Sequence, residues 1–212
     1  VSTRLIGALI MTHGDQRGLI LPPAVAPVQT ILVPIAAKKE GVLEATEALC
    51  AQLTAAGIRA ETDTTDNSPG WKFNEWEMKG VPLRIELGPR DIEAGKMTLV
   101  RRDTHEKTEA PLENAAETVR NLLADIQANL LALAKKRKEE RVVPAENMDE
   151  LLQGVEGGNF VKAGWCGCRE CEDKVKEQTA ATARVLVEGE QADTCVCCGK
   201  KAKHVVLFAR AY

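Results

Sequence analysis

The chain has 212 residues, 44% of them hydrophobic and 28% charged, which is ordinary for a soluble globular protein of one or two domains and a small third. Its formal net charge of −3 excludes a global nucleic-acid signature, although local basic stretches leave a nucleic-acid partner open. The sequence shows no apolar run of membrane-spanning length and no signal-peptide pattern, so we expect a cytoplasmic protein with no membrane partner.

The first 27 residues are predicted to form a segment of their own. Leu5–Met11 is almost continuously apolar, as in a buried strand or helix, and Arg4 stands at its edge. Gly18–Pro27 contains three prolines within six residues, which indicates an extended connector and a domain boundary. Because the chain starts at Val1 and not at Met, we expect a fragment of a longer protein.

Residues 28–141 are predicted to be an α/β domain, a mixed β-sheet flanked by helices. Cys50, on the apolar face of one of its helices, is most simply a core residue. The expected strands are Val28–Ile35, Ile58–Asp63, Pro82–Leu87 and Met97–Arg102. The expected helices are Lys38–Gly57, Trp71–Lys79 and Pro111–Leu133, the last with Pro111 in its first turn.

Ser68–Asp91 is the most distinctive stretch of this domain. It holds two of the three Trp and one of the three Phe, mixed with charged residues and punctuated by Pro and Gly. One interpretation is an ordinary helix and strand whose rings pack inward. The other is a surface on which rings stack on unpaired bases while charged groups read the base edges. The pattern alone leaves both open.

A basic run, Lys135–Lys138 with Arg141, closes the helix predicted from Pro111 onward. Cations at a helix C-terminus complement the helix dipole, so a solvated end explains the run. Contact with a phosphate backbone explains it equally well.

Residues 142–212 are predicted to form a second, small α/β domain. Short helices are expected at Glu146–Gln153 and Arg169–Gln178, and strands at Asn159–Trp165, Ala183–Val187 and His204–Ala209. Six of the seven cysteines fall between Cys166 and Cys198, and an odd count argues against a disulfide framework.

The six clustered cysteines indicate a tetrahedral Zn²⁺ site, because they form two knuckles about two dozen residues apart. Zinc takes four thiolates and the sequence offers six, with Cys197 and Cys168 as substitutes. We expect a structural metal, since four thiolates leave no position for water. A thiol redox centre at Cys197-Cys198 is the alternative. The favoured ligands are Cys166, Cys171, Cys195 and Cys198.

Together these segments resemble the C-terminal part of a prolyl-tRNA synthetase, a class II enzyme, of the archaeal and eukaryotic type. VSTRLIGALIMTHGD resembles the third signature motif of the class, and GLILPPAVAPVQTILVPI the exit from the catalytic domain. SPGWKFNEWEMKGVPLRIELGPRD and VRRDTHEK are similar to the anticodon-binding domain, and the cysteines with the terminal LFARAY to the zinc-binding domain.

The resemblance implies roles for individual residues. Arg4 and the adjacent Ser2 would lie in the ATP site, and Tyr212 would carry the terminal carboxylate towards the active site. Trp71 and Trp76 are expected in core and hinge packing. The positions that would read the guanines of the proline anticodon are Phe73, Glu77, Arg84, Arg90 and Asp91.

The implied activity of the full protein is activation of proline with ATP, with Mg²⁺ expected, and transfer to tRNA(Pro). The resemblance also implies a homodimer. The other signature motifs and the proline pocket are not in this sequence, so we expect the segment alone not to form prolyl-adenylate. The competing hypothesis is a free-standing zinc-containing module that binds RNA or protein.

Overall fold

A computed structural model describes residues 2–211, and the chain divides into two compact units, Val1–Leu133 and Ala134–Tyr212. Tyr212, which the resemblance directs towards an active site, lies outside the described residues. None of the described helices has the length and apolarity that a membrane crossing needs.

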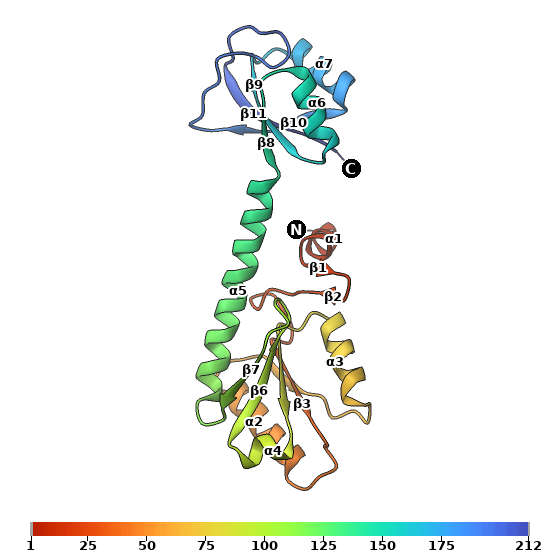
Figure 1. Cartoon of the computed structure of the whole chain (residues 1–212), viewed down its shortest axis with the longest axis vertical. Helices are drawn as coiled ribbons and strands as arrows, with labels where there is room; N and C mark the ends of the chain where they lie inside the picture. The colour runs from red at the N-terminus through yellow and green to blue at the C-terminus, as the bar shows by residue number, and fades with distance from the viewer. Residues whose placement is uncertain (1, 212) are drawn as a thin grey trace. The chain divides into compact units, whose positions relative to one another are not determined.

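The first unit is built on a mixed sheet with the strand order β4-β3-β5-β6-β7 (Figure 1). Strand β3 is parallel to β4 and β5, and the strands from β5 to β7 are antiparallel. The strands are β1 (Gly14–Asp15), β2 (Gly18–Leu19), β3 (Thr30–Pro34), β4 (Ala60–Thr62), β5 (Leu83–Leu87), β6 (Lys96–Arg101) and β7 (Lys107–Pro111). The helices are α1 (Arg4–Thr12), α2 (Val42–Ala55), α3 (Pro69–Met78), α4 (Pro89–Glu93) and α5 (Ala115–Glu140), which continues past Leu133.

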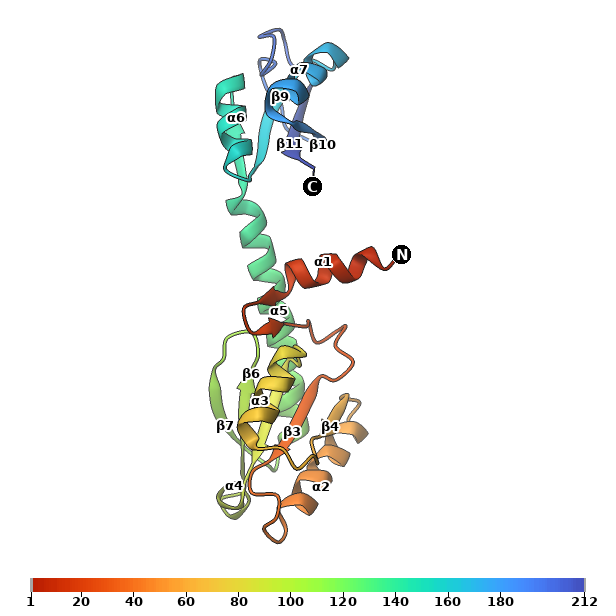
Figure 2. The same cartoon turned by 90° about the vertical axis from the view of Figure 1, so that its right-hand side faces the viewer.

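Side-chain alternation divides this sheet into two different faces. Leu32 and its neighbours on β5 and β6 pack against α2 and α5 in the main core. Ile31 and Val33 point the other way and pack against Phe73 and Trp76 of α3 in a smaller cluster. Figures 1 and 2 show α5 and α3 on opposite sides of the sheet. The α3 side therefore carries less apolar packing and leaves room for polar side chains.

The second unit has a four-stranded mixed sheet in the order β10-β11-β9-β8. Strand β8 is parallel to β9, and β11 is antiparallel to both of its neighbours. Its core joins Leu151, Val175 and Phe208, from two helices and the central strand. The elements are β8 (Val142–Ala145), α6 (Met148–Glu156), β9 (Phe160–Trp165), α7 (Arg169–Thr179), β10 (Ala181–Val187) and β11 (His204–Arg210). The predicted α/β class with mixed sheets is confirmed.

The expected burial of Leu5–Met11 is wrong within the described residues. The segment is a helix, α1, but Leu5, Ile6, Ile10 and Met11 are each more than half exposed. An apolar run shows that a segment can be buried, whereas burial itself requires a partner surface, and the short β1–β2 hairpin beside α1 does not provide one.

The predicted start of the long helix at Pro111 is also wrong. Pro111 ends β7, an edge strand that the sequence analysis missed, and pairs with Lys96 of β6. An edge strand tolerates proline, because the missing N–H would otherwise face solvent. The helix starts at Ala115 and contains the whole basic run to Lys138. The sequence analysis also missed β1, β2, β8 and α4, all five residues long or shorter.

Candidate functional site

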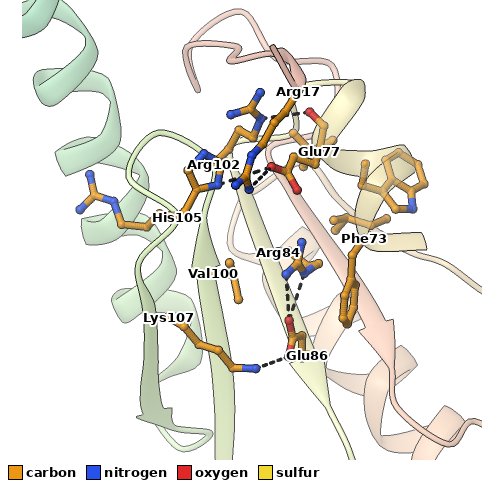
Figure 3. A pocket seen from close by; sticks show the side chains of 13 residues that line it. Arg17, Phe73, Glu77, Arg84, Glu86, Val100, Arg102, His105 and Lys107 are labelled. Atoms are coloured by element: carbon orange, nitrogen blue, oxygen red, sulfur yellow. Dashed lines mark hydrogen bonds and ion pairs between the residues drawn. The ribbon is translucent and has the colours of Figure 1, made fainter. Parts of the chain in front are cut away.

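A cavity of about 320 Å³ opens on the α3 side of the first sheet, and we call it the β5–β6 cavity (Figure 3). Alternation explains its polar floor: Arg84 and Glu86 face the cavity, whereas Leu83, Ile85 and Leu87 face the core. Its lining residues are Arg17, Ile31, Phe73, Trp76, Glu77, Val81, Arg84, Glu86, Val100, Arg101, Arg102, His105 and Lys107.

Helix α3 forms one wall of the cavity and is anchored by buried polar contacts to Asp63. Trp76 donates its indole N–H to Asp63 Oδ2 at 2.7 Å. The Lys72 ammonium lies 3.3 Å from Asp63 Oδ1 and donates to the Asp63 carbonyl at 2.9 Å. Burial alone would raise the pKa of Asp63, but hydrogen bonds from Thr65 and Trp76 and the charge of Lys72 outweigh it and lower the pKa. These contacts fix the position from which Phe73 faces the cavity.

The two tryptophans of α3 therefore differ. Trp76 is partly buried and packs in the small cluster with Ile31 and Val33, as expected. Trp71 is 50% exposed, so the core packing predicted for it is wrong within the described residues. Lys72, not the neighbouring Trp71, occupies the buried position on this turn, because Asp63 supplies it with a partner.

The floor of the cavity pairs a planar cation with an aromatic ring. Arg84 lies with its guanidinium carbon 4.0 Å from the centroid of the Phe73 ring, which is cation–π geometry. Glu86 accepts from Arg84 Nε at 3.1 Å and Nη2 at 3.0 Å, and from Lys107 Nζ at 2.7 Å. A guanidinium has five N–H donors. Within residues 2–211, Glu86 accepts hydrogen bonds from two of the five N–H donors of Arg84, which leaves three donors for a ligand.

The rim of the cavity holds a second carboxylate, Glu77. Arg17 Nη1 lies 3.0 Å from Glu77 Oε1, and His105 Nδ1 lies 3.5 Å from the same oxygen. Arg102 donates to the Glu77 carbonyl at 3.0 Å and forms a two-bond ion pair with Asp15. The hydrogen bonds from Arg102 hold the pKa of Asp15 far below its usual range. Glu77 is thus positioned by groups from two separate segments, the β1–β2 hairpin and the turn between β6 and β7.

Two glycines permit the close approach of β2 to the end of α3 at this rim. Gly18 has φ +135°, and a Cβ there would lie 2.4 Å from the Met78 Cα. Gly80 has φ +76°, and a Cβ there would lie 2.5 Å from the Leu19 Cβ. No other residue type fits either position without moving backbone. The contact sets the spacing between Arg17 and Glu77.

The structure brings three of the five predicted reading residues together: Phe73, Glu77 and Arg84 line the cavity. Arg90 and Asp91 lie on α4, beyond the end of β5, and do not line it. Arg90 is exposed, and Asp91 accepts a hydrogen bond from the Gly88 N–H at 2.8 Å as part of the α4 cap. Ser2 and Arg4 are both exposed at the start of α1.

Sequence reasoning missed several lining residues, among them Arg17, Glu86 and His105. Glu86 could have been found, because it is two residues from Arg84 on a strand and so shares its face. Lys107 and His105 belong to the VRRDTHEK stretch, but only the turn between β6 and β7, in which His105 has φ +59°, shows which of its side chains face the cavity.

The second unit gathers cysteine thiols at the junction of two knuckles. The Sγ atoms of Cys166, Cys171, Cys195 and Cys198 all lie within 4.8 Å of one another. Cys166 Sγ is 3.7 Å from Cys171 Sγ and 3.9 Å from Cys198 Sγ. Zinc–sulfur bonds of about 2.3 Å place the corners of a tetrahedron about 3.8 Å apart. The four favoured cysteines therefore have the spacing to hold one metal ion.

The local fold presents these thiols to a positively polarised environment. Cys168 is the N-cap of α7 and Cys171 lies in its first turn, where the helix dipole favours thiolates. Burial raises the pKa of Cys171 in the metal-free thiol form. Burial would also raise that of Cys195, but backbone N–H groups of Cys198 and Cys197 outweigh it and lower the pKa to about 7.

The thiols border a second cavity, of about 670 Å³, which we call the thiol cavity. Cys50 does not line this cavity: it lies half-buried on α2 and packs against the main core of the first unit, as expected. The thiol cavity is lined by Cys166, Cys168, Glu170, Cys171, Lys174, Cys197, Cys198, Lys200, Lys201 and Lys203.

Comparison with known proteins gives matches over both units. Residues 29–122 match the model of an anticodon binding domain, and residues 148–212 match that of the C-terminal domain of prolyl-tRNA synthetase. Over its whole length the chain is 50% identical to a proline--tRNA ligase of Oceanobacillus iheyensis and 52% identical to one of Ruminiclostridium cellulolyticum. The chain belongs to the prolyl-tRNA synthetase family.

The chain corresponds to the C-terminal portion of prolyl-tRNA synthetases and spans 45% of the length of both relatives. A prolyl-tRNA synthetase from Cryptosporidium parvum, solved with L-proline and AMP, matches 99% of this chain and 46% of its own, at 38% identity and a TM-score of 0.91. The family and the fold predicted from the sequence are both confirmed.

Proposed function

We propose that the full protein is a proline--tRNA ligase, which activates proline with ATP and transfers it to tRNA(Pro). The names of the relatives and the proline and AMP in the Cryptosporidium parvum structure support this activity. In this proposal residues 1–27 are the tail of the catalytic domain, 28–141 read the anticodon and 142–212 form the metal domain. The homodimer, the Mg²⁺ requirement, the ATP contacts of Ser2 and Arg4 and the cytoplasmic location stay predictions.

The role of the described residues is to bind the anticodon of tRNA(Pro) in the β5–β6 cavity. The pairing of Arg84 with Phe73, 4.0 Å apart, is the observation that carries the proposal. Phe73 offers a face on which an unpaired base stacks. Arg84 has three donors for the O6 and N7 acceptors of guanine. Glu77 supplies an acceptor for the N1–H and N2–H groups of a guanine.

The preformed ion pairs explain why this cavity suits base recognition. Glu86 and Lys107 hold Arg84 from one side, and Arg17 with His105 holds Glu77 from the other. Side chains already fixed in position lose less conformational entropy when a base binds. Arg90 and Asp91 stay predictions as base contacts, and their place on α4 makes them the outer residues of the proposed site.

The test is binding of tRNA(Pro) transcripts to the chain 1–212, measured by fluorescence anisotropy at one fixed salt concentration. We expect Arg84→Ala to weaken binding by about 1–3 kcal/mol, the value of one bidentate base contact, and to abolish the preference over a transcript whose anticodon guanines are replaced. Arg120→Ala removes the same charge from exposed α5 and is the control. A uniform, equal loss in both variants would contradict the assignment.

We further propose that the four favoured cysteines hold a structural Zn²⁺. Zinc would be bound by four thiolates with no open position, so it would link the turn after β9, helix α7 and the second knuckle without taking part in the reaction. Metal analysis of the purified chain tests this: one tightly held zinc per chain is expected. Metal-free protein with a reversible Cys197–Cys198 disulfide would instead favour the redox alternative.

A further inference from the structure

The metal domain contains more thiols than one tetrahedral ion uses. Cys168 and Cys197 are left over when four cysteines bind zinc, yet both line the thiol cavity together with three of the four proposed ligands. Neither is in a disulfide. Cys168 Sγ lies only 3.2 Å from Cys166 Sγ. A thiol cluster with six members at one place has the composition for more than one thiophilic ion.

Two of the cysteines lie between the surplus thiols and the rest of the cluster. Cys166 Sγ is in contact with the surplus Cys168, at 3.2 Å, and with Cys198, at 3.9 Å. Cys171 Sγ lies 3.7 Å from Cys166 Sγ, and Cys171 lines the thiol cavity together with both surplus thiols, Cys168 and Cys197. Cys166 and Cys171 therefore have the position that a shared, bridging ligand must have.

The charge of the site does not oppose a second ion. One divalent ion with four thiolates carries −2, and two divalent ions with six thiolates also carry −2. Four lysines, Lys174, Lys200, Lys201 and Lys203, line the same cavity. Within residues 2–211 none of these four ammonium groups lies within 4.0 Å of a carboxylate, so they are available to offset an anionic cluster in either state.

We propose that the thiol cluster binds a second thiophilic divalent cation. Cys168 and Cys197 are its terminal ligands, and Cys166 and Cys171 are bridging thiolates shared with the first ion. This proposal rests on the four-cysteine zinc site proposed above. Tetrahedral coordination of two ions needs eight metal–sulfur bonds, which six thiolates supply when two of them bridge. The second ion binds more weakly than the first, because each bridging thiolate divides its donation between two ions.

Cadmium is the probe for this second position, because it is thiophilic and its thiolate bonds absorb in the ultraviolet. The chain 1–212 is reduced, stripped of metal and titrated with Cd²⁺, and native mass spectrometry counts the ions. We expect two ions per chain, bound in two steps, with thiolate absorbance still rising during the second step. The second ion should leave first when a weak chelator is added.

The double variant Cys168→Ser/Cys197→Ser should bind one ion per chain and lose the second absorbance step, whereas Cys50→Ser should still bind two. Circular dichroism checks that the one-ion variant is folded. Saturation of the wild type at one ion in excess Cd²⁺, or two ions in the double variant, would overturn the proposal. If the four-cysteine zinc site itself were wrongly assigned, Cys195→Ser would leave the number of bound ions unchanged. Failure of that earlier proposal is therefore distinguishable from failure of this one.

Discussion

The two cavities are both lined by charged groups but are held together in opposite ways. In the β5–β6 cavity every carboxylate already has a cation from the same chain: Glu86 has Arg84 and Lys107, and Glu77 has Arg17. In the thiol cavity the chain supplies lysines, but the thiols contact one another. The first site is complete as folded, whereas in our proposal a metal ion joins the parts of the second.

The difference extends to the cores beneath the two sites. The first unit has a large apolar core on the far side of its sheet, independent of the cavity residues. In the second unit Val196, between two cysteines of the second knuckle, belongs to the main core, and Cys197 packs against it. In our proposal the first site depends on the fold beneath it, whereas the fold of the second unit depends on its metal site.

Metal removal is the strongest way to test this difference. A structural zinc contributes on the order of 10 kcal/mol to the folding of a small domain. A chelator that strips the metal should therefore abolish amide-exchange protection in residues 142–211 and leave that of β3, β5 and β6 unchanged. Continued protection of α7 after the metal is demonstrably gone would contradict the structural role.

Among single substitutions in the first unit, one at Lys72 is expected to lower the free energy of unfolding most. Lys72→Met leaves the Asp63 carboxylate buried without its cation, because their side chains are only 4% and 2% exposed. Breaking a buried pair costs about 3–5 kcal/mol. Urea unfolding of the first unit measures it. Lys96→Met, which breaks an exposed pair with Glu109, is the matched control and should cost less than about 1 kcal/mol.

Phe73→Leu should affect binding and leave stability nearly unchanged. Leucine keeps the apolar contact in the α3 cluster but cannot stack on a base, and stacking contributes about 1–3 kcal/mol per base. The affinity for tRNA(Pro) should fall accordingly. If it did not, the ring of Phe73 would be packing only. Trp71→Leu, on the exposed side of the same helix, is the control.

Mild acid is expected to have the smallest effect, and it should destabilise the two units at different pH values. Protons compete with metal for thiolates, so the second unit should lose stability first as the pH falls. In the first unit, burial would raise the pKa of Asp103, but hydrogen bonds from Arg101 and Asn129 lower it, and the pKa of Asp63 is lowered as well. Carboxylates with a depressed folded pKa contribute stability above the unfolded value, about 3.8, and lose it as the pH falls through the folded pKa. Thermal melts from pH 7 to pH 3 test this order.

The sequence predicted the elements whose pattern is local and missed the features that depend on a partner. Alternation in Pro82–Leu87 identifies β5, and helical spacing identifies α2 and α5. Pro111 is compatible with both a helix start and an edge strand, and only its pairing with Lys96 decides between them. The exposure of α1 and of Trp71 depends on what lies opposite each of them, which no local pattern contains.

The candidate site was predictable to a similar extent. Phe73, Glu77 and Arg84 are recognisable from the resemblance, and the structure places them at one cavity. Arg17 reaches that cavity from the connector by way of the β1–β2 hairpin, with no signal in its own surroundings in the sequence. Likewise the sequence favours four of the six clustered cysteines as metal ligands, and the Sγ positions give those four the spacing that suits one ion.

The glycine contact between β2 and α3 has a consequence for how this sequence can change over time. Half of its positions differ from those of the Oceanobacillus iheyensis relative, with the same fold expected. Gly18 and Gly80 do not have that freedom, because a single methyl group at either would overlap the opposite segment. A substitution at one of these glycines cannot be compensated by a substitution at the other. We therefore expect the spacing of Arg17 and Glu77 to be retained as long as selection maintains the function of the cavity.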